Sequence, residues 1–459
     1  MFPEAFINRI KQQPYIDSEG LLRALEEPSP VTIRINRAKW DNEPLNSETV
    51  PWCRDGYYLD TRPSYTLDPL FHAGCYYPQE ASSMFLEEAY KQVASNNKGI
   101  KVLDLCGAPG GKSTHLSTLI GQEGLLVSNE VIRSRASVLA ENLTRWGLSN
   151  VIVTQNDPSS FSRLQGFFDL ILVDAPCSGE GMFRDRIAIS EWSEANAMHC
   201  SERQKRILME VWPALREGGI LIYSTCTFNP AENEMNIKWL TERHQAETLK
   251  LVISAFKNIA EIEYKGTYGY GFFPGRTRGE GLFMSVVRKT GKQEEVDPFK
   301  KTGSSGRITI KEITILNEWT HFLADNLIRA ENDLILPACS YNDYLTLSGN
   351  LRIVKAGTRI CAVKGDKYLP VHETAISVYF NKESFPAVNV SIDQALTYLS
   401  RGQFTADNIQ KGWNIVRYNG VNLGFINNIG SRINNYYPVE WRIRMTIPGS
   451  VSENILKWR

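Results

Sequence analysis

Short apolar runs alternate with amphipathic stretches between residues 100 and 290. Each run has the length of a buried strand, and the runs cover residues 101–106, 124–130, 151–154, 169–174 and 220–225. Apolar residues recur at helical spacing in between, over residues 113–120, 133–148 and 201–215. Continuous apolar strands that alternate with helices are typical of a parallel sheet covered on both faces. The pattern therefore predicts a doubly wound, Rossmann-like α/β domain over residues 96–290.

The segments before and after this domain have different patterns. Residues 1–95 are expected to form a separate N-terminal α+β unit. A polar stretch at residues 289–306, with Gly and Ser near its end, indicates a linker or a surface loop. It introduces a middle unit over residues 291–385, which is expected to hold a helix near residues 316–330 and short strands at 351–354 and 359–363.

The last unit covers residues 386–459. A helix is predicted at residues 392–399 and a strand at 413–418. The strand ends at Asn419-Gly420, which is a hairpin signal in a small β-rich domain.

Composition and charge narrow the class of protein only slightly. The chain has 459 residues, of which 42% are hydrophobic, and its 51 basic and 51 acidic side chains give a formal net charge of zero. From residue 386 to the end, eight basic side chains stand against four acidic ones, which fits either a modest footprint for nucleic acid or an ordinary solvated surface. Apolar runs stay far below the ~20 residues of a membrane span, and the N-terminus lacks the apolar centre of a signal peptide. We expect a cytoplasmic protein with no membrane partner.

The eight cysteines and six histidines show none of the usual metal-site spacings. There is no C-x-x-C pair and no H-x-x-x-H pair, so neither a zinc site nor a disulfide framework is expected. The thiols are expected to be reduced, and most of them to be small buried hydrophobic groups.

A glycine-rich turn between the first strand and the first helix is the candidate cofactor loop. It reads Cys106-Gly107-Ala108-Pro109-Gly110-Gly111-Lys112. A nucleotide-binding P-loop would need its first glycine at Cys106, so that match fails by one position. An adenosyl cofactor instead needs an acid after the second strand for the ribose and a polar group after the third, and Glu130 and Asp157 are suitably placed. The sequence favours S-adenosylmethionine over a nucleoside triphosphate or a purely structural turn.

Two cysteines follow later strands of the same sheet. Cys177 belongs to Asp174-Ala-Pro-Cys, and Cys226 follows Ser224-Thr225. Carboxyl ends of parallel strands form the ligand-binding edge, so the two thiols are expected to be neighbours rather than two packing cysteines. Beside a methyl donor, a thiolate that adds to C6 of a pyrimidine makes C5 nucleophilic. A nearby carboxylate, for which Asp174 is placed, would hold N3 and the exocyclic amine of cytosine.

These motifs resemble the signature set of the NOL–NOP–Sun family of RNA cytosine-5 methyltransferases. Three segments carry the resemblance: LDLCGAPGGKST, ILVDAPCSGEGMFR and IYSTCTFNPAENE. Two earlier segments, HAGCYYPQEASSMF and PVTIRINRAKW, extend it over residues 30–290. Four further segments resemble the RsmF-like branch of the family. One is Gly179-Glu-Gly-Met-Phe-Arg184, and the others lie in the tail: Tyr398-Leu-Ser-Arg-Gly402, Gly412-Trp413 and Asn435-Tyr-Tyr-Pro438. That branch methylates 16S ribosomal RNA and ends in a PUA-like RNA-binding domain.

The resemblance implies a class I methyltransferase sheet and a role for each motif residue. Cys226 would attack C6, and Cys177 would assist release of the product. The implied cofactor set is residues 106–112 with Glu130, Asp157 and Asp174, while Lys112 and Arg135 match family positions that line the pocket. Gly107 stands where alanine is common in the family.

The implied function is S-adenosylmethionine-dependent methylation of C5 of a cytosine in RNA, with RNA-binding units at both ends of the chain. Ribosomal RNA or the small ribosomal subunit is the favoured partner, and tRNA is the alternative substrate. A non-catalytic RNA-binding assembly factor is a further alternative, against which the intact Cys226, Cys177 and Asp174 argue. A monomer without metal is expected.

Overall fold

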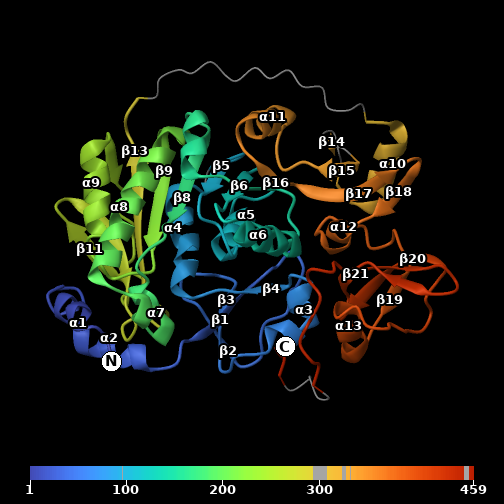
Figure 1. The fold of residues 1–459 in the computed structure, drawn as a ribbon, viewed down its shortest axis with the longest axis horizontal. Coiled ribbons are helices and arrows are strands. Elements are labelled where there is room, and N and C mark those ends of the chain that lie inside the picture. The colour runs from blue at the N-terminus through green and yellow to red at the C-terminus, as the bar shows by residue number, and fades with distance from the viewer. Residues whose placement is uncertain (96, 293–307, 323–326, 331, 449–453) are drawn as a thin grey trace.

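The computed structural model describes residues 1–95, 97–292, 308–322, 327–330, 332–448 and 454–459. Most of the linker predicted at residues 289–306 lies outside these ranges. Within them, the chain forms one large central sheet and three smaller sheets of four strands each (Figure 1). None of the helices in the described ranges is long and apolar enough to span a bilayer.

The central sheet has ten strands, of which nine follow the order β11-β12-β13-β9-β8-β5-β6-β7-β16. Its parallel core is β5 (Lys101–Asp104), β6 (Leu125–Asn129), β7 (Val151–Thr154), β8 (Phe168–Asp174) and β9 (Leu215–Thr225). These are the five predicted strands, so the Rossmann-like α/β class is confirmed. Antiparallel strands extend one edge, namely β10 (Ala246–Thr248), β11 (Ala260–Tyr264), β12 (Thr267–Phe272) and β13 (Leu282–Lys289).

Helices cover both faces of this sheet, as its apolar strands require. On one face, α4 (Leu86–Val93), α5 (Gly111–Leu119) and α6 (Arg133–Trp146) bury their apolar sides. On the other face lie α8 (Glu194–Val211) and α9 (Glu234–Arg243). The helix predicted to start at residue 201 begins earlier, because the side chain of Ser193 accepts a hydrogen bond from the Asn196 N–H and caps α8.

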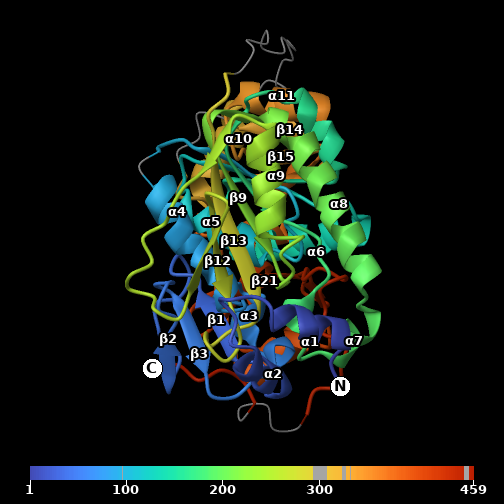
Figure 2. The same ribbon diagram turned by 90° about the vertical axis from the view of Figure 1, so that its left-hand side faces the viewer.

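The N-terminal unit has two parts. Its helices α1 (Glu4–Ile10) and α2 (Ser18–Glu26) pack near α7 (Arg186–Glu191) at one end of the central sheet (Figure 2). Its small sheet is made of β1 (Val31–Ile35), β2 (Ser47–Thr49), β3 (Gly56–Leu59) and β4 (Tyr76–Pro78), in the order β2-β3-β1-β4. The short helix α3 (Pro69–His72) lies between β3 and β4 in the chain.

The segment after the linker shares one strand with the central sheet. Strand β16 (Ile353–Ala356) pairs antiparallel with β7, at the edge opposite β11. The other strands form a small sheet in the order β14-β15-β17-β18, made of β14 (Ile328–Ala330), β15 (Asp333–Leu336), β17 (Thr358–Lys364) and β18 (Lys367–Pro370), and α10 (Ile310–Trp319) and α12 (His372–Ile376) pack beside it. Helix α11 (Tyr341–Asn350) instead buries Leu347 in the core of the central sheet.

The helix predicted near residues 316–330 is wrong. Helix α10 ends at Trp319, because Thr320 adopts an extended backbone and forms a bridge with Phe380. Residues 328–330 then form β14, where Ile328 is buried against its partner strand. Tertiary pairing has overridden the local helical pattern here.

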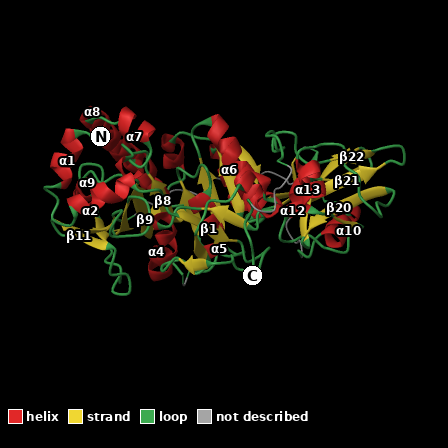
Figure 3. Ribbon diagram, turned by 90° about the horizontal axis from the view of Figure 1, so that it is seen from below, coloured by secondary structure: helices red, strands yellow, loops and turns green. Residues whose placement is uncertain are grey.

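The C-terminal unit contains the predicted hairpin. Helix α13 (Ile392–Leu399) lies beside the sheet β19 (Ala387–Asn389), β20 (Gly412–Tyr418), β21 (Val421–Asn428) and β22 (Ile433–Asn435). Asn419 and Gly420 connect β20 to β21 with φ of 47° and 77°, which is the positive region that this tight turn needs. In the view from below, this unit and α1 lie at opposite ends of the molecule (Figure 3).

Candidate active site at the carboxyl ends of the central strands

An open cleft with an empty volume of about 1030 Å³ lies where β5, β6, β7, β8 and β9 end. Eight of the predicted site residues line it: Cys106, Ala108, Glu130, Arg135, Asp157, Asp174, Cys177 and Cys226. Strand β5 has β6 on one side and β8 on the other, so the cleft opens at the switch point of the sheet. Five distant segments of the sequence therefore meet at one place.

The glycine-rich loop forms one end of this cleft. Gly110 precedes α5 with φ of 121°, a conformation that side chains rarely adopt. Two side chains of α6 hold the loop from outside: Arg135 Nη2 donates to the Ala108 carbonyl at 3.0 Å, and Asn142 Nδ2 donates to the Pro109 carbonyl at 2.8 Å. Gly107, Pro109, Gly110, Gly111 and Lys112 shape the loop without lining the cleft wall.

Two acids lie at the cofactor end of the cleft. Glu130 is buried; its carboxylate accepts the Ile132 N–H at 2.9 Å and lies 3.4 Å from Arg135 Nη1. Asp157 is exposed and accepts both the N–H and the O–H of Ser159, which lowers the pKa of its carboxyl. Both carboxyl groups have oxygens that can accept hydrogen bonds from hydroxyl groups of a ligand.

Asp174 is fixed between two donors in the middle of the cleft. Lys112 Nζ lies 2.8 Å from Asp174 Oδ2, and Ser224 Oγ donates to Asp174 Oδ1 at 2.7 Å. Burial alone would lower the pKa of Lys112, but the Asp174 carboxylate outweighs it and the pKa is raised. The ammonium therefore stays charged, and this pair sets the orientation of the carboxylate.

The two thiols are in direct contact. Cys177 Sγ lies 2.8 Å from Cys226 Sγ, and the Cys226 N–H donates to Cys177 Sγ at 3.2 Å. The hydrogen bond with Cys226, together with burial, raises the pKa of Cys177 well above its usual value. Cys177 therefore keeps its proton, and its S–H can donate toward Cys226.

A buried carboxylate holds the loop that carries Cys177. Glu232 accepts the Ser178 N–H at 2.9 Å and its hydroxyl at 2.6 Å, and Gln204 Nε2 donates to the same carboxylate at 3.1 Å. Sequence reasoning missed this anchor, which lies between the Cys226 strand and α9.

Sequence reasoning also missed the wall that α8 provides. Arg203, Arg206 and Ile207 line the cleft from this helix, and Val131, Ile132 and Pro158 line it from the loops after β6 and β7. A usable signal was present, since α8 connects the two cysteine-bearing strands and these three residues recur at helical spacing.

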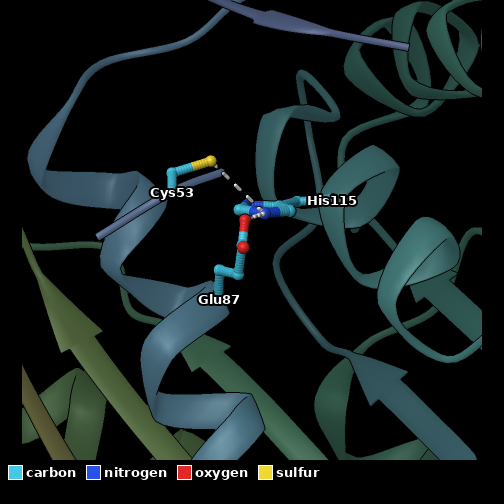
Figure 4. A group of neighbouring side chains, drawn as sticks. All are labelled: Cys53, Glu87 and His115. Carbon is cyan, nitrogen blue, oxygen red and sulfur yellow. Dashed lines mark hydrogen bonds and ion pairs between the residues drawn. The ribbon is translucent and has the colours of Figure 1, made fainter. Parts of the chain in front are cut away.

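A second cluster lies outside the cleft, between α4, α5 and the loop before β3 (Figure 4). Cys53, Glu87 and His115 are buried, and one possible metal-ligand atom of each lies within 4.8 Å of the others. Glu87 already pairs with Lys91 at 2.6 Å, and the charge of Arg34 acts on both Cys53 and His115. A divalent cation would add positive charge beside Lys91 and Arg34. The cluster is better explained as a polar contact between α4 and α5, in which Glu87 and His115 pair at 3.0 Å. That the protein binds no metal stays a prediction.

Three family models match separate stretches of the chain. The family described as 16S rRNA methyltransferase RsmB/F matches residues 92–288. The N-terminal domain of 16S rRNA methyltransferase RsmF matches residues 2–81, and the methyltransferase RsmF PUA domain matches residues 385–443.

Two curated relatives match along nearly their whole length. Ribosomal RNA small subunit methyltransferase F of Enterobacter sp. (strain 638) is 30% identical, over 96% of this chain and 95% of its own. The protein of the same name from Klebsiella pneumoniae (strain 342) is also 30% identical, over 96% of each chain.

Solved structures share the fold of 63% of the chain. A methyltransferase homolog protein from Pyrococcus horikoshii is 28% identical with a TM-score of 0.53, over 63% of this chain and 95% of its own. NSun6 from the same organism, solved with SFG, is 20% identical with a TM-score of 0.51, over 63% and 99%.

Proposed function

The chain belongs to the RsmF-type branch of the 16S rRNA methyltransferase RsmB/F family, and from this premise we propose that it methylates C5 of a cytosine in 16S rRNA. The methyl donor is S-adenosylmethionine, and the reaction passes through a covalent bond between Cys226 and C6 of the base. The observation that carries this proposal is the contact of Cys226 with Cys177 inside the cleft that Asp174 and Glu130 also line. The resemblance drawn from the sequence is confirmed at the level of the family.

The cleft residues fit an adenosyl cofactor. Glu130 offers a buried carboxylate for the two ribose hydroxyls, and Asp157 lies at the neighbouring strand end. Val131 and Ile132 are 43% and 48% exposed along the same wall, which suits contact with a flat adenine ring. Cys106 and Ala108 complete the pocket on the loop side. When bound there, S-adenosylmethionine supplies an electrophilic methyl group.

Cys226 performs the nucleophilic step. Its thiolate forms a bond with C6, and the electron pair of the C5–C6 double bond moves so that C5 can take up the methyl group. Loss of the C5 proton then restores the double bond, and the C6–S bond breaks with its electron pair returning to sulfur. Cys177 lies 2.8 Å from that sulfur, close enough to assist its departure.

Asp174 orients the base. Its carboxylate, fixed by Lys112 and Ser224, can accept the exocyclic amine of cytosine and hold a proton at N3 during attack on C6. A protonated N3 stabilises the electron pair that the thiolate pushes into the ring. A target base inside a helix would have to be flipped out to reach this carboxylate.

The RNA partner is proposed from the relatives' names and the C-terminal PUA domain. Residues 1–95 and 386–459 are proposed as RNA-binding units on either side of the catalytic unit 96–290, with 291–385 between them. A monomeric, cytoplasmic enzyme remains a prediction.

Replacement of Cys226 tests the proposal. Cys226→Ala should lower methyl transfer to 16S rRNA or small subunits by about 1000-fold or more, because the nucleophile is lost. S-adenosylmethionine affinity should stay within about twofold, since no proposed cofactor contact is removed. The product is read as 5-methylcytidine by mass spectrometry of digested RNA, and the Kd by calorimetry.

Cys339→Ala is the matched control, because Cys339 does not line the cleft. Undiminished activity of Cys226→Ala would contradict the assignment and move the nucleophile to Cys177. Methylation at a position other than C5 would contradict the proposed chemistry itself.

A further inference from the structure

The first helix of the chain packs against both loops that carry the active-site cysteines. The Phe6 ring of α1 is fully buried, with its centroid 4.9 Å from that of Phe183 and 6.4 Å from that of Phe228. Gln13, just beyond α1, donates from Nε2 to the Phe228 carbonyl at 3.1 Å. Phe183 follows Cys177 and Phe228 follows Cys226 in the chain, so α1 contacts each loop shortly after its cysteine.

One buried carboxylate connects the two loops. Glu180, in the Cys177 loop, has a fully buried side chain, and its Oε2 accepts the Phe228 N–H at 3.2 Å. Its Oε1 accepts Trp192 Nε1 at 2.9 Å. The next residue, Gly181, donates its N–H to the Cys226 carbonyl at 2.9 Å. The spacing of the two thiols therefore depends on where this carboxylate lies.

The cation that balances Glu180 comes from α1. Arg9 Nη2 lies 2.5 Å from Glu180 Oε2, and the Arg9 side chain is 22% exposed. The guanidinium also lies 5.8 Å from the Phe6 ring centre and 5.9 Å from that of Trp192. An ionised carboxylate without a partner is strongly unfavourable at such a site, so the loops would rearrange if Arg9 were lost.

We propose that Arg9 is a positioning residue of the methyl-transfer site, which keeps the two cysteine loops in register through Glu180. This rests on the proposed function for its catalytic meaning, but the thiol geometry it concerns exists without substrate. The N-terminal helix then belongs to the active site as well as to the N-terminal unit. A misplacement of about 1 Å between reacting groups lowers turnover markedly, so the contact matters although Arg9 touches neither thiol.

The test compares Arg9→Met with Arg9→Lys, and with Arg23→Met as the matched control. Arg23 is an exposed arginine of α2 with no ion pair among the described residues. Alkylation of Cys226 by iodoacetamide is followed from pH 6 to 10 in the full-length protein without RNA, and is mapped by peptide mass spectrometry. kcat and KM for methyl transfer are measured on the same samples.

Arg9→Met should shift the pH midpoint of Cys226 alkylation upward by about half a unit or more, because an unbalanced carboxylate between the two cysteine loops disfavours a thiolate there. Turnover should fall about tenfold with KM for the methyl donor unchanged within about twofold. Arg9→Lys keeps the charge and should retain most of the wild-type midpoint, and Arg23→Met should retain all of it.

The double variant Arg9→Met with Glu180→Gln distinguishes the proposed charge effect from a general folding defect. It removes both charges, keeps an oxygen that can accept the Phe228 N–H, and should bring the midpoint back toward the wild-type value. An Arg9→Met protein whose midpoint matches the control would overturn the proposal, whatever its stability. If Cys226→Ala proved active, the proposed function would fail while the alkylation result would still decide the role of Arg9.

Discussion

Among the single residues of the cofactor loop, Gly107 has the least space around it. A Cβ built there would lie 2.2 Å from Ser128 Oγ and 2.8 Å from Ser113 Oγ. These hydroxyls bond to each other at 2.8 Å, and Ser113 donates to the buried Asp104 carboxylate at 2.6 Å. Glycine at this position is explained by the serine at 128.

Gly107→Ala should therefore lower the free energy of unfolding by about 1–3 kcal/mol, because the Ser128 hydroxyl must move. The double variant Gly107→Ala with Ser128→Ala should lose less than the sum of the two single changes, since the closest contact is removed. Urea denaturation of the four proteins measures this coupling. Strict additivity would contradict the explanation.

The place of the candidate catalytic side chains in one cleft could be predicted from the sequence, but the groups that position them could not. The motifs place Cys226, Cys177 and Asp174 after strands, and parallel strands bring their ends to one edge. Glu180 and Glu232 act through neighbours that are far away in the chain, and no local pattern marks such partners.

At the scale of elements, β16 shows how a distant segment supports the cofactor pocket. Just before this strand, the Arg352 N–H donates to Asn156 Oδ1 at 3.0 Å, and the Arg352 carbonyl accepts the Gln155 N–H at 3.0 Å. Asn156 precedes Asp157, which lines the cleft. Asn156 Nδ2 also donates to the Arg352 carbonyl at 3.2 Å. All three contacts use the backbone of Arg352, so its side chain should matter little.

Arg352→Pro removes the N–H and should weaken S-adenosylmethionine binding about fivefold, the value of one hydrogen bond of about 1 kcal/mol. Leu351 already has φ of −124° and ψ of 149°, which suits a residue before proline. Calorimetry gives the Kd, and Arg352→Ala, which keeps the backbone donor, should match the wild-type protein. Equal affinities for Arg352→Pro and Arg352→Ala would rule out this support.

The alternating core of the fold was predictable, whereas the middle segment was predictable only in part. The strands expected at 351–354 and 359–363 correspond to β16 and β17, but the partner of β16 and the helix at 316–330 were not foreseen correctly. Strands β5 to β9 contain continuous apolar runs separated by glycine-containing turns, and this pattern predicts a parallel sheet covered by helices on both faces. Strand β16 pairs with a strand some two hundred positions earlier, and β14 replaces the end of a helical pattern. Pairing of this kind depends on the partner surface rather than on the local sequence.

At the scale of the whole molecule, four regions meet at a buried aromatic cluster. His72 Nδ1 lies 3.1 Å from the Tyr437 hydroxyl, and the His372 ring of α12 packs 5.2 Å from Tyr437 and 5.0 Å from Trp441. The Arg145 guanidinium of α6 lies 5.2 Å from the Trp441 ring centre. The N-terminal, catalytic, middle and C-terminal units are therefore joined through one site that contains neutral imidazoles.

Acid should weaken this junction. Burial and the nearby Arg145 lower the pKa of His372 to about 3, so its contribution to stability is complete above pH 6.5 and is lost as the pH falls toward 3. Buried Asp68 and Asp104, whose pKa values burial raises to about 6 and about 7, act in the opposite direction. The effect is therefore best measured as a difference between variants.

Relative to the wild-type protein, His372→Leu should gain about 1.3 kcal/mol in unfolding free energy when the pH is lowered from 7.5 to 5.5. The exposed His321 provides the control, and His321→Leu should show no comparable gain. Urea denaturation at the two pH values measures both. A pH-independent difference for His372→Leu would mean that this imidazole is not held neutral.

The most direct measurement of the central claim is the isolation of the covalent intermediate from Cys177→Ala. This variant, incubated with S-adenosylmethionine and 16S rRNA or small subunits, should accumulate a protein–RNA adduct that survives denaturing electrophoresis, because the step that releases C6 is slowed. Peptide mass spectrometry should locate a methylated cytidine on Cys226. An active wild-type enzyme whose Cys177→Ala variant yields no adduct, or an adduct on any other residue, would contradict the account.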